Sequence, residues 1–146
     1  PVTFAGRNEN VERARSEGVE FGYEFRGRAW HVRAEATLQD PRNRDTGERL
    51  LRRARESYVL AVERVAGRLA FGADVTYAGN RIDAAFPANA RRGSYTLVNA
   101  TARLAVTGRW SVQARLDNAF GEDYTLVYGY RTSGRGFTLA TRFAFQ

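Results

Sequence analysis

The sequence contains no cysteine and no lysine, and its one histidine is His31. The lack of cysteine excludes disulfides, thiolate metal sites and thiol nucleophiles, and one histidine excludes a site built from several. No apolar run approaches the roughly 20 residues that a membrane-spanning helix requires. The N-terminus has neither an initiator methionine nor the basic and apolar regions of a signal peptide, so we expect Pro1 to be a processed or truncated start.

The charge is strongly basic, because 23 basic residues, all arginines, outnumber 16 acidic ones. Such an excess would suit a nucleic-acid binder, but many of these arginines fall in or beside the longest predicted loops. A guanidinium binds phosphate in a bidentate manner, so loops that face the phosphorylated outer leaflet of an outer membrane would use them equally well. Solvated loop charge without a partner is the alternative. We predict no nucleic-acid partner.

Alternation of apolar and polar residues recurs along the chain and predicts β-strands. The predicted strands lie near residues 18–25, 30–39, 53–65, 69–77, 98–106, 110–116 and 137–145, and residues 2–4 would end an eighth. Short turns at 26–28, 66–68 and 107–109 alternate with long loops at about 40–51, 79–94 and 119–135. Residues 5–15 are expected on the same side as these loops.

This asymmetry is typical of outer-membrane barrels, whose periplasmic turns are short and whose extracellular loops are long. Hydrocarbon offers no hydrogen-bond partners, so a β protein crosses it only as a closed barrel. We therefore predict an all-β fold of about eight antiparallel transmembrane strands. A soluble lipocalin-type barrel has a similar length and alternation, but the aromatics near the strand ends and the ionic, Gly and Thr residues on the opposite faces favour the membrane.

Aromatic residues near the predicted periplasmic end suggest lipid-facing girdle positions. Trp30 and Trp110 each follow a short turn, and Phe143 and Phe145 close the last strand. Aromatic rings concentrate at the boundary between hydrocarbon and water. We expect these four side chains to face lipid.

Two sequence motifs carry a family resemblance. Residues 118–124 (N-A-F-G-E-D-Y) resemble the N-L-F-D-x-x-Y signature near the end of TonB-dependent outer-membrane transporters, with Ala119 and Gly121 where that family usually has Leu and Asp. Residues 10–20 (N-V-E-R-A-R-S-E-G-V-E) resemble the family's N-x-x-x-A-x-x-x-G-V-E entry into an earlier strand. The resemblance covers nearly the whole chain but only the end of the family's protein.

The resemblance implies a domain organisation and a function. Residues 1–146 would be the C-terminal portion of a receptor β-barrel in the outer membrane of a Gram-negative bacterium, with the plug domain absent from the chain. The expected partners are outer-membrane lipid and lipopolysaccharide, and in the full-length protein a plug domain and TonB. Residues 50–55 and 127–132 are most similar to the family's cobalamin (vitamin B12) transporters, which implies a corrinoid ligand.

Two other functions remain open. One is a siderophore or iron-chelate receptor of the same family, and the other is a small, self-closed structural membrane barrel. No acid–base pair, nucleophile constellation or phosphate-cradling glycine loop is evident, so we expect no enzymatic activity and no catalytic residue. Glu20, His31 and Glu35 are expected to point into the lumen and to bind neighbouring arginines or a plug.

The extracellular loops supply the candidate substrate-binding residues. They are Tyr130 and Arg42 or Arg44, because a planar polar ligand can stack on tyrosine and accept hydrogen bonds from arginine. The alternative roles are a girdle aromatic and loop ion pairs.

Carboxylates in the first long loop offer a candidate calcium site. Asp40, Asp45 and Glu48 could hold the ion, but their spacing lacks the pattern of an EF-hand loop. We favour solvated charge, and predict no metal site or cofactor in this segment. Calcium remains a candidate ligand of the full-length protein.

Overall fold

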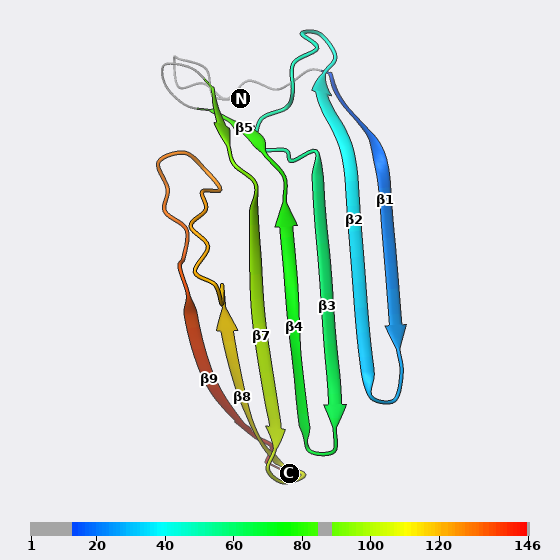
Figure 1. Ribbon diagram of the computed structural model, residues 1–146, viewed down its shortest axis with the longest axis vertical. Coiled ribbons are helices and arrows are strands. Elements are labelled where there is room, and N and C mark those ends of the chain that lie inside the picture. The colour runs from blue at the N-terminus through cyan, green and yellow to red at the C-terminus, as the bar shows by residue number, and fades with distance from the viewer. Residues whose placement is uncertain (1–12, 85–88, 146) are drawn as a thin grey trace.

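A computed structural model describes residues 13–84 and 89–145 of the chain. Seven long strands form one antiparallel sheet in the order β1-β2-β3-β4-β7-β8-β9 (Figure 1). They are β1 (Ala14–Arg26), β2 (Trp30–Asn43), β3 (Glu56–Ala66), β4 (Leu69–Ala78), β7 (Tyr95–Ala105), β8 (Trp110–Asp117) and β9 (Gly136–Phe143). A separate hairpin pairs β5 (Arg81–Asp83) with β6 (Ala90–Arg92). The predicted all-β, antiparallel fold is confirmed, and the strand end predicted at residues 2–4 lies outside the described residues.

The strand register gathers the apolar residues on one face of the sheet. Val19 lies opposite Leu38, and Leu60 lies opposite Val75. The same alternation continues across the whole sheet to β9, where Leu139 lies opposite Ala114. Since successive side chains of a strand point to opposite faces, one continuous apolar face covers all seven strands.

This apolar face is exposed rather than packed into a core. Val19 and Phe137 each expose 69% of their surface, and Leu139 exposes 67%. Among the described residues, Ala70 and Pro41 are the buried apolar side chains. A soluble monomer rarely leaves an apolar patch of more than a few hundred Å² in water. The face therefore requires apolar surroundings, and strands of 10 to 14 residues are long enough to cross a hydrocarbon layer. The described residues contain no helix with the length and apolarity to span a membrane.

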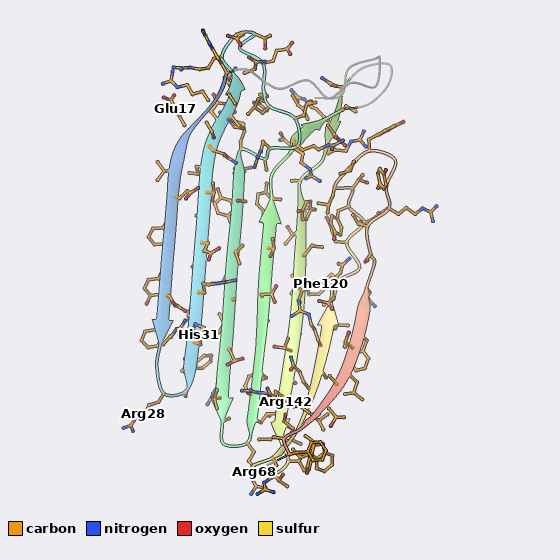
Figure 2. All side chains as sticks on the ribbon, turned by 180° about the vertical axis from the view of Figure 1, so that it is seen from behind. Glu17, Arg28, His31, Arg68, Phe120 and Arg142 are labelled. Carbon is orange, nitrogen blue, oxygen red and sulfur yellow. The ribbon has the colours of Figure 1, made fainter. Side chains whose placement is uncertain are left out.

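The opposite face of the sheet is polar. The Glu24 carboxylate accepts hydrogen bonds from Arg26 and from His31 Nε2, the latter at 2.8 Å. Farther along the sheet, Asn99 donates to Asp74 at 2.7 Å. Figure 2 shows His31 near the turn that joins β1 to β2. One face thus carries hydrogen-bonded polar side chains, and the other carries exposed apolar side chains. This is the arrangement of the lumen and lipid sides of a membrane barrel.

The sheet has a short-turn end and a long-loop end (Figure 1). The turns at residues 27–29, 67–68 and 106–109 lie at one end, together with the C-terminal end of β9. The connections at 44–55 and 118–135 and the β5–β6 hairpin lie at the other end. The predicted alternation of short turns and long loops is confirmed.

Several strand boundaries differ from the sequence prediction. β7 begins at Tyr95 rather than near residue 98, and β9 ends at Phe143 rather than at Phe145. β2 continues through Pro41 to Asn43 instead of ending near residue 39. The Pro41 carbonyl points away from β1 and accepts the Leu50 N–H, so the N–H that proline lacks is not needed for pairing with β1. β1 begins at Ala14, because the longer β2 gives it pairing partners up to Asn43.

The start of β3 and the second long loop also differ from the prediction. β3 begins at Glu56 rather than near residue 53, because Arg52 has a left-handed φ of 60° and donates its N–H to the Ile82 carbonyl instead of joining a strand. The predicted loop at 79–94 contains the β5–β6 hairpin. Its strands have three residues each, which is too short for a clear alternation of apolar and polar residues.

Candidate functional site

A buried aspartate joins three segments at the long-loop end. Asp83, at the end of β5, has no exposed surface, and its carboxylate accepts a hydrogen bond from Arg52 Nε at 2.6 Å. The other carboxylate oxygen accepts the backbone N–H of Tyr128. The link is therefore between the β2–β3 loop, the hairpin and the β8–β9 loop.

The environment of Asp83 keeps its carboxylate ionised. Burial alone would raise the pKa of Asp83, but the hydrogen bonds from the Arg52 guanidinium and the Tyr128 backbone N–H outweigh it and lower the pKa below its ordinary value. Hydrogen bonds to a charged group are stronger than those between neutral groups. The link is therefore at full strength at neutral pH.

Aromatic and cationic side chains reinforce the same junction. The Arg81 guanidinium lies 5.3 Å from the centre of the Tyr95 ring, which in turn lies 4.6 Å from the Tyr124 ring. Arg81 also donates to the Thr125 carbonyl of the β8–β9 loop. This stack fastens the β8–β9 loop to the hairpin and to the start of β7.

Asn118 fixes the point where the β8–β9 loop leaves the sheet. It has a left-handed φ of 47° and is 5% exposed. Its side-chain Oδ1 accepts the Glu122 N–H at 2.8 Å, and its Nδ2 donates to the Glu122 carbonyl at 2.9 Å. The Asn118 N–H donates to Asn99 Oδ1. Asparagine tolerates this backbone conformation better than most residues, which gives the first residue of the N-A-F-G-E-D-Y motif a physical role.

The fastened loops surround a hollow of about 500 Å³. It is lined by Arg52, Leu126, Val127, Tyr130, Arg131 and Thr132. Its mixture of apolar, aromatic and cationic side chains is typical of a ligand site with a few orienting polar groups. Tyr130 is 73% exposed, so its ring is available to a ligand that approaches from the loop end. Arg52 belongs both to this hollow and to the Asp83 link.

The predicted substrate-binding residues do not lie together. Tyr130 lines the hollow, but neither Arg42 nor Arg44 does. Arg42 donates to the Asp40 carboxylate at 2.7 Å and to the Gly47 carbonyl at 2.9 Å, so it holds the β2–β3 loop. The arginines beside Tyr130 are Arg52 and Arg131. Sequence reasoning placed Arg52 and Arg131 in loops without assigning either to a site.

The predicted girdle residues lie at the short-turn end of the apolar face. Trp110 pairs in register with Phe143, and its indole Nε1 donates to Thr141 Oγ1 at 2.8 Å. The Phe143 and Phe145 rings lie 4.9 Å apart. Trp30 begins β2 and has the Arg64 guanidinium 5.1 Å from its ring centre. Contact of these rings with lipid remains a prediction.

The polar face of the sheet carries a smaller hollow, of about 330 Å³, whose lining includes Glu24, His31, Glu63 and Asp74. Of the other two predicted lumen residues, Glu35 lies 3.7 Å from Arg33 and Glu20 lies in register with Thr37. No cluster of three or more His, Cys, Asp or Glu side chains in the described part of the chain could hold a metal ion. Asp40, one of the three candidate calcium ligands, is instead paired with Arg42.

Comparison with known proteins gives concordant results from sequence and structure. A family model described as TonB dependent receptor-like, beta-barrel, matches residues 1–119. The vitamin B12 transporter BtuB of Vibrio vulnificus is 28% identical over 141 residues, which cover 93% of this chain and 22% of that protein. The chain thus spans about a fifth of the length of this curated relative.

Solved structures of receptors have the same fold. The ferric-catecholate import receptor Fiu from E. coli K12 matches with a TM-score of 0.80 at 22% identity, over 90% of this chain and 21% of that chain. A complex of the Pseudomonas aeruginosa receptor FpvA with a ferric pyoverdine matches with a TM-score of 0.79 at 20% identity, over 89% of this chain and 19% of that chain.

Proposed function

The chain belongs to the TonB-dependent receptor β-barrel family, and from this premise we propose that the complete protein imports a corrinoid, cobalamin or a close relative, with energy supplied through TonB. The family resides in the outer membrane of Gram-negative bacteria, and its members are transporters and receptors rather than enzymes. The long loops therefore face the outside and the short turns face the periplasm. The relative BtuB is a vitamin B12 transporter, which supports this ligand class.

We further propose that this chain is one section of a larger barrel. In the described residues, β1 and β9 are the outer strands of the sheet, each paired on one side. Unpaired strand edges are not tolerated in hydrocarbon, so further strands must pair with both. The chain covers only about a fifth of its curated relative. We infer that the remainder of the full-length protein supplies these strands and a plug.

The hollow beside Tyr130 is the observation that supports a ligand site in this section. It opens at the long-loop end, and the Asp83 link holds its walls in place before any ligand arrives. A preformed site avoids the entropic cost of ordering loops on binding. A planar, weakly charged ligand such as a corrinoid would stack on the Tyr130 ring and accept hydrogen bonds from Arg131.

The same hollow supports an iron chelate as the second candidate ligand. Two of its six lining residues are arginines, which suits an anionic ferric complex. Among the structurally similar proteins, Fiu is a ferric-catecholate import receptor, and FpvA was solved with a ferric pyoverdine. The two candidates differ in charge, and this difference separates them experimentally.

Tyr130→Ala in the full-length receptor tests the corrinoid proposal. Loss of the aromatic contact should weaken cyanocobalamin binding by roughly 0.5–1.5 kcal/mol, which isothermal titration would measure as a two- to twelvefold change in Kd. Phe120→Ala is the matched control, because Phe120 is an exposed aromatic of the same loop that does not line the hollow. Equal losses for both variants would contradict a contact at Tyr130.

The salt dependence of ligand binding provides a second test, because the two candidate ligands differ in charge. Cyanocobalamin has no net charge, so its affinity should change little between low and high salt, and Arg131→Ala should act mainly through a lost hydrogen bond. An anionic ferric chelate should bind more weakly as salt rises. A receptor that binds the chelate but no corrinoid would disprove the corrinoid proposal and support the alternative.

A further inference from the structure

Arg52 lines the hollow beside Tyr130 and also pairs with a buried anion. Its Nε donates to Asp83 Oδ1 at 2.6 Å. The Arg52 side chain exposes 53% of its surface, whereas the Asp83 side chain exposes none. The guanidinium therefore contacts the carboxylate while part of the side chain remains open to the hollow.

The backbone holds this arginine in a fixed position. Arg52 has a left-handed φ of 60°, a conformation that costs an arginine energy and persists only where the surroundings fix it. Its N–H donates to the Ile82 carbonyl at 2.7 Å, and Ile82 precedes Asp83 in β5. One short segment thus binds both the backbone and the side chain of Arg52. The ion pair is therefore built into the junction and is not a chance contact between two surface charges.

The negative charge of Asp83 is present at neutral pH and is shielded from water. Burial raises the pKa of Asp83, but the hydrogen bonds from the Arg52 guanidinium and the Tyr128 backbone N–H lower it below its ordinary value. The potentials of two opposite charges at hydrogen-bond distance largely cancel at longer range. To a ligand in the hollow, Arg52 and Asp83 together therefore act as a weak dipole rather than as a full positive charge.

The other guanidinium of the hollow has no such counter-ion. Arg131 forms no ion pair with any described residue, and no carboxylate lines the hollow. The charge of Arg131 is thus uncompensated, whereas that of Arg52 is cancelled. The Asp83 link uses the Nε donor of Arg52, and the remaining N–H groups of that guanidinium can still donate hydrogen bonds to a ligand.

We propose that Asp83 determines the ligand specificity of the hollow by acting as the counter-ion of Arg52, so that the hollow selects a weakly charged, hydrogen-bonding ligand over a multiply charged anion. This inference rests on the proposed function of the hollow as a ligand site. Asp83 acts through Arg52 and is a positioning residue. Specificity is a difference between two affinities, and the buried carboxylate lowers the affinity for an anion more than the affinity for a neutral ligand.

Binding of two probes of different charge to the full-length receptor tests the proposal. The probes are cyanocobalamin, which is neutral, and a ferric tris-catecholate, which is a trianion, and isothermal titration gives the Kd of each. Asp83→Asn frees the charge of Arg52, so the ratio of the trianion Kd to the cyanocobalamin Kd should fall about fivefold, as expected for one exposed ion pair. A merely structural role of Asp83 would weaken the binding of both probes and leave this ratio unchanged.

Two further variants show whether the effect passes through Arg52. In the double variant Asp83→Asn with Arg52→Gln, the freed charge is removed again, so the ratio should return to the wild-type value although the Asp83 link is still broken. Asp123→Asn is the matched control, because it makes the same change of charge at an exposed carboxylate of the β8–β9 loop that does not line the hollow. It should leave the ratio unchanged. Heat-modifiable migration in gels confirms that each variant folds.

The outcomes separate this proposal from the corrinoid proposal. An unchanged ratio in Asp83→Asn, an equal fall in Asp123→Asn, or a double variant that keeps the lowered ratio would overturn the counter-ion role even where cyanocobalamin binds. A wild-type receptor that binds only the trianion would disprove the corrinoid proposal. In that case the counter-ion role requires trianion affinity to fall more steeply with salt in Asp83→Asn than in wild type, and equal salt dependence overturns it. Binding of neither probe to wild type overturns both proposals.

Discussion

The two ends of the sheet hold the chain by different means. At the short-turn end, the connections are closed by nearby backbone bonds, such as Gly27 N–H to the Trp30 carbonyl at 2.8 Å and Val106 N–H to the Trp110 carbonyl at 2.9 Å. At the long-loop end, Asp83 joins residues that lie 31 and 45 positions away in the sequence. The turns of one end are closed by bonds between neighbours in the sequence, and the loops of the other end are joined by a few long-range side chains.

This difference shows where the sequence can vary without loss of the fold. The short turns bond within themselves and to the adjacent strands, as Val65 N–H does to the Ala29 carbonyl, so the strand register at that end is fixed independently of the loops. The long loops can change in sequence and ligand provided that their few links are kept, as expected for binding loops on a rigid scaffold. A vitamin B12 transporter accordingly matches this chain in sequence, and a ferric-catecholate import receptor matches it in fold.

The largest expected effect concerns which end faces outward. In a full-length receptor without other cysteines, Ser133→Cys in the β8–β9 loop should react with an impermeant thiol reagent on intact cells. Gly108→Cys in the β7–β8 turn should not react, and the structure has room for that side chain. Fluorescence of the labelled band measures the result. Labelling of Gly108→Cys alone would mean that the short-turn end, and not the long-loop end, faces the outside of the cell.

The next effect concerns the apolar band that separates the two ends. Leu60→Arg places a charge on the apolar face near the middle of β3 and should destabilise folding into lipid vesicles by about 2–4 kcal/mol. Thr76→Arg, on the polar face of the adjacent β4, should cost much less. Folding yield at increasing urea measures both variants. Equal tolerance would mean that the band does not face hydrocarbon.

The strands and their faces could be predicted from the sequence because they follow a strict local rule. Val19, Phe21 and Tyr23 alternate with polar residues, and such a period determines both the strand and the face. The approximate lengths of the loops were correct for the same reason. No register was assigned from the sequence, although short turns leave few ways to pair the flanking strands.

The site could be predicted only in part because its contacts are long-range. Tyr130, which was predicted from loop chemistry, lines the hollow. Arg52, which lines the same hollow, lies 78 positions earlier in the sequence, and no local pattern connects the two. Asp83 has no distinguishing motif, and its role arises from burial against two loops. Gly121 has a left-handed φ of 69°, a conformation that aspartate also tolerates. This explains how glycine can replace the family's usual residue.

A moderate effect is expected from breaking the Asp83 link. Asp83→Asn keeps the shape of the side chain but removes its charge, and a hydrogen bond to a charged group contributes roughly 1.5–3 kcal/mol. Hydrogen exchange at the Tyr128 amide should therefore accelerate about ten- to hundredfold. Asp123→Asn, an exposed carboxylate of the same loop, should leave the rate unchanged. An equal response from both variants would place the stability of the loop elsewhere.

Acid should weaken the same link in the wild-type protein. Because the pKa of Asp83 is lowered in the folded state, its contribution to stability is complete above the unfolded pKa of about 3.9 and is lost as pH falls through the lower folded value. Tyr128 exchange, corrected for its intrinsic rate, should accelerate below about pH 4 in wild type. In Asp83→Asn it should show no such step.

The smallest effect is expected at the short-turn end, where Trp110→Phe removes the indole donor to Thr141 but keeps an aromatic ring at the girdle position. The lost hydrogen bond, 2.8 Å long in the structure, should reduce the free energy of unfolding by about 0.5–1.5 kcal/mol. Thr141→Val should cost a similar amount, and the double variant should cost less than the sum, because both changes remove one bond. Denaturant unfolding in lipid vesicles measures all three. Full additivity would show that the indole and the hydroxyl do not interact, and that backbone pairing alone holds this end.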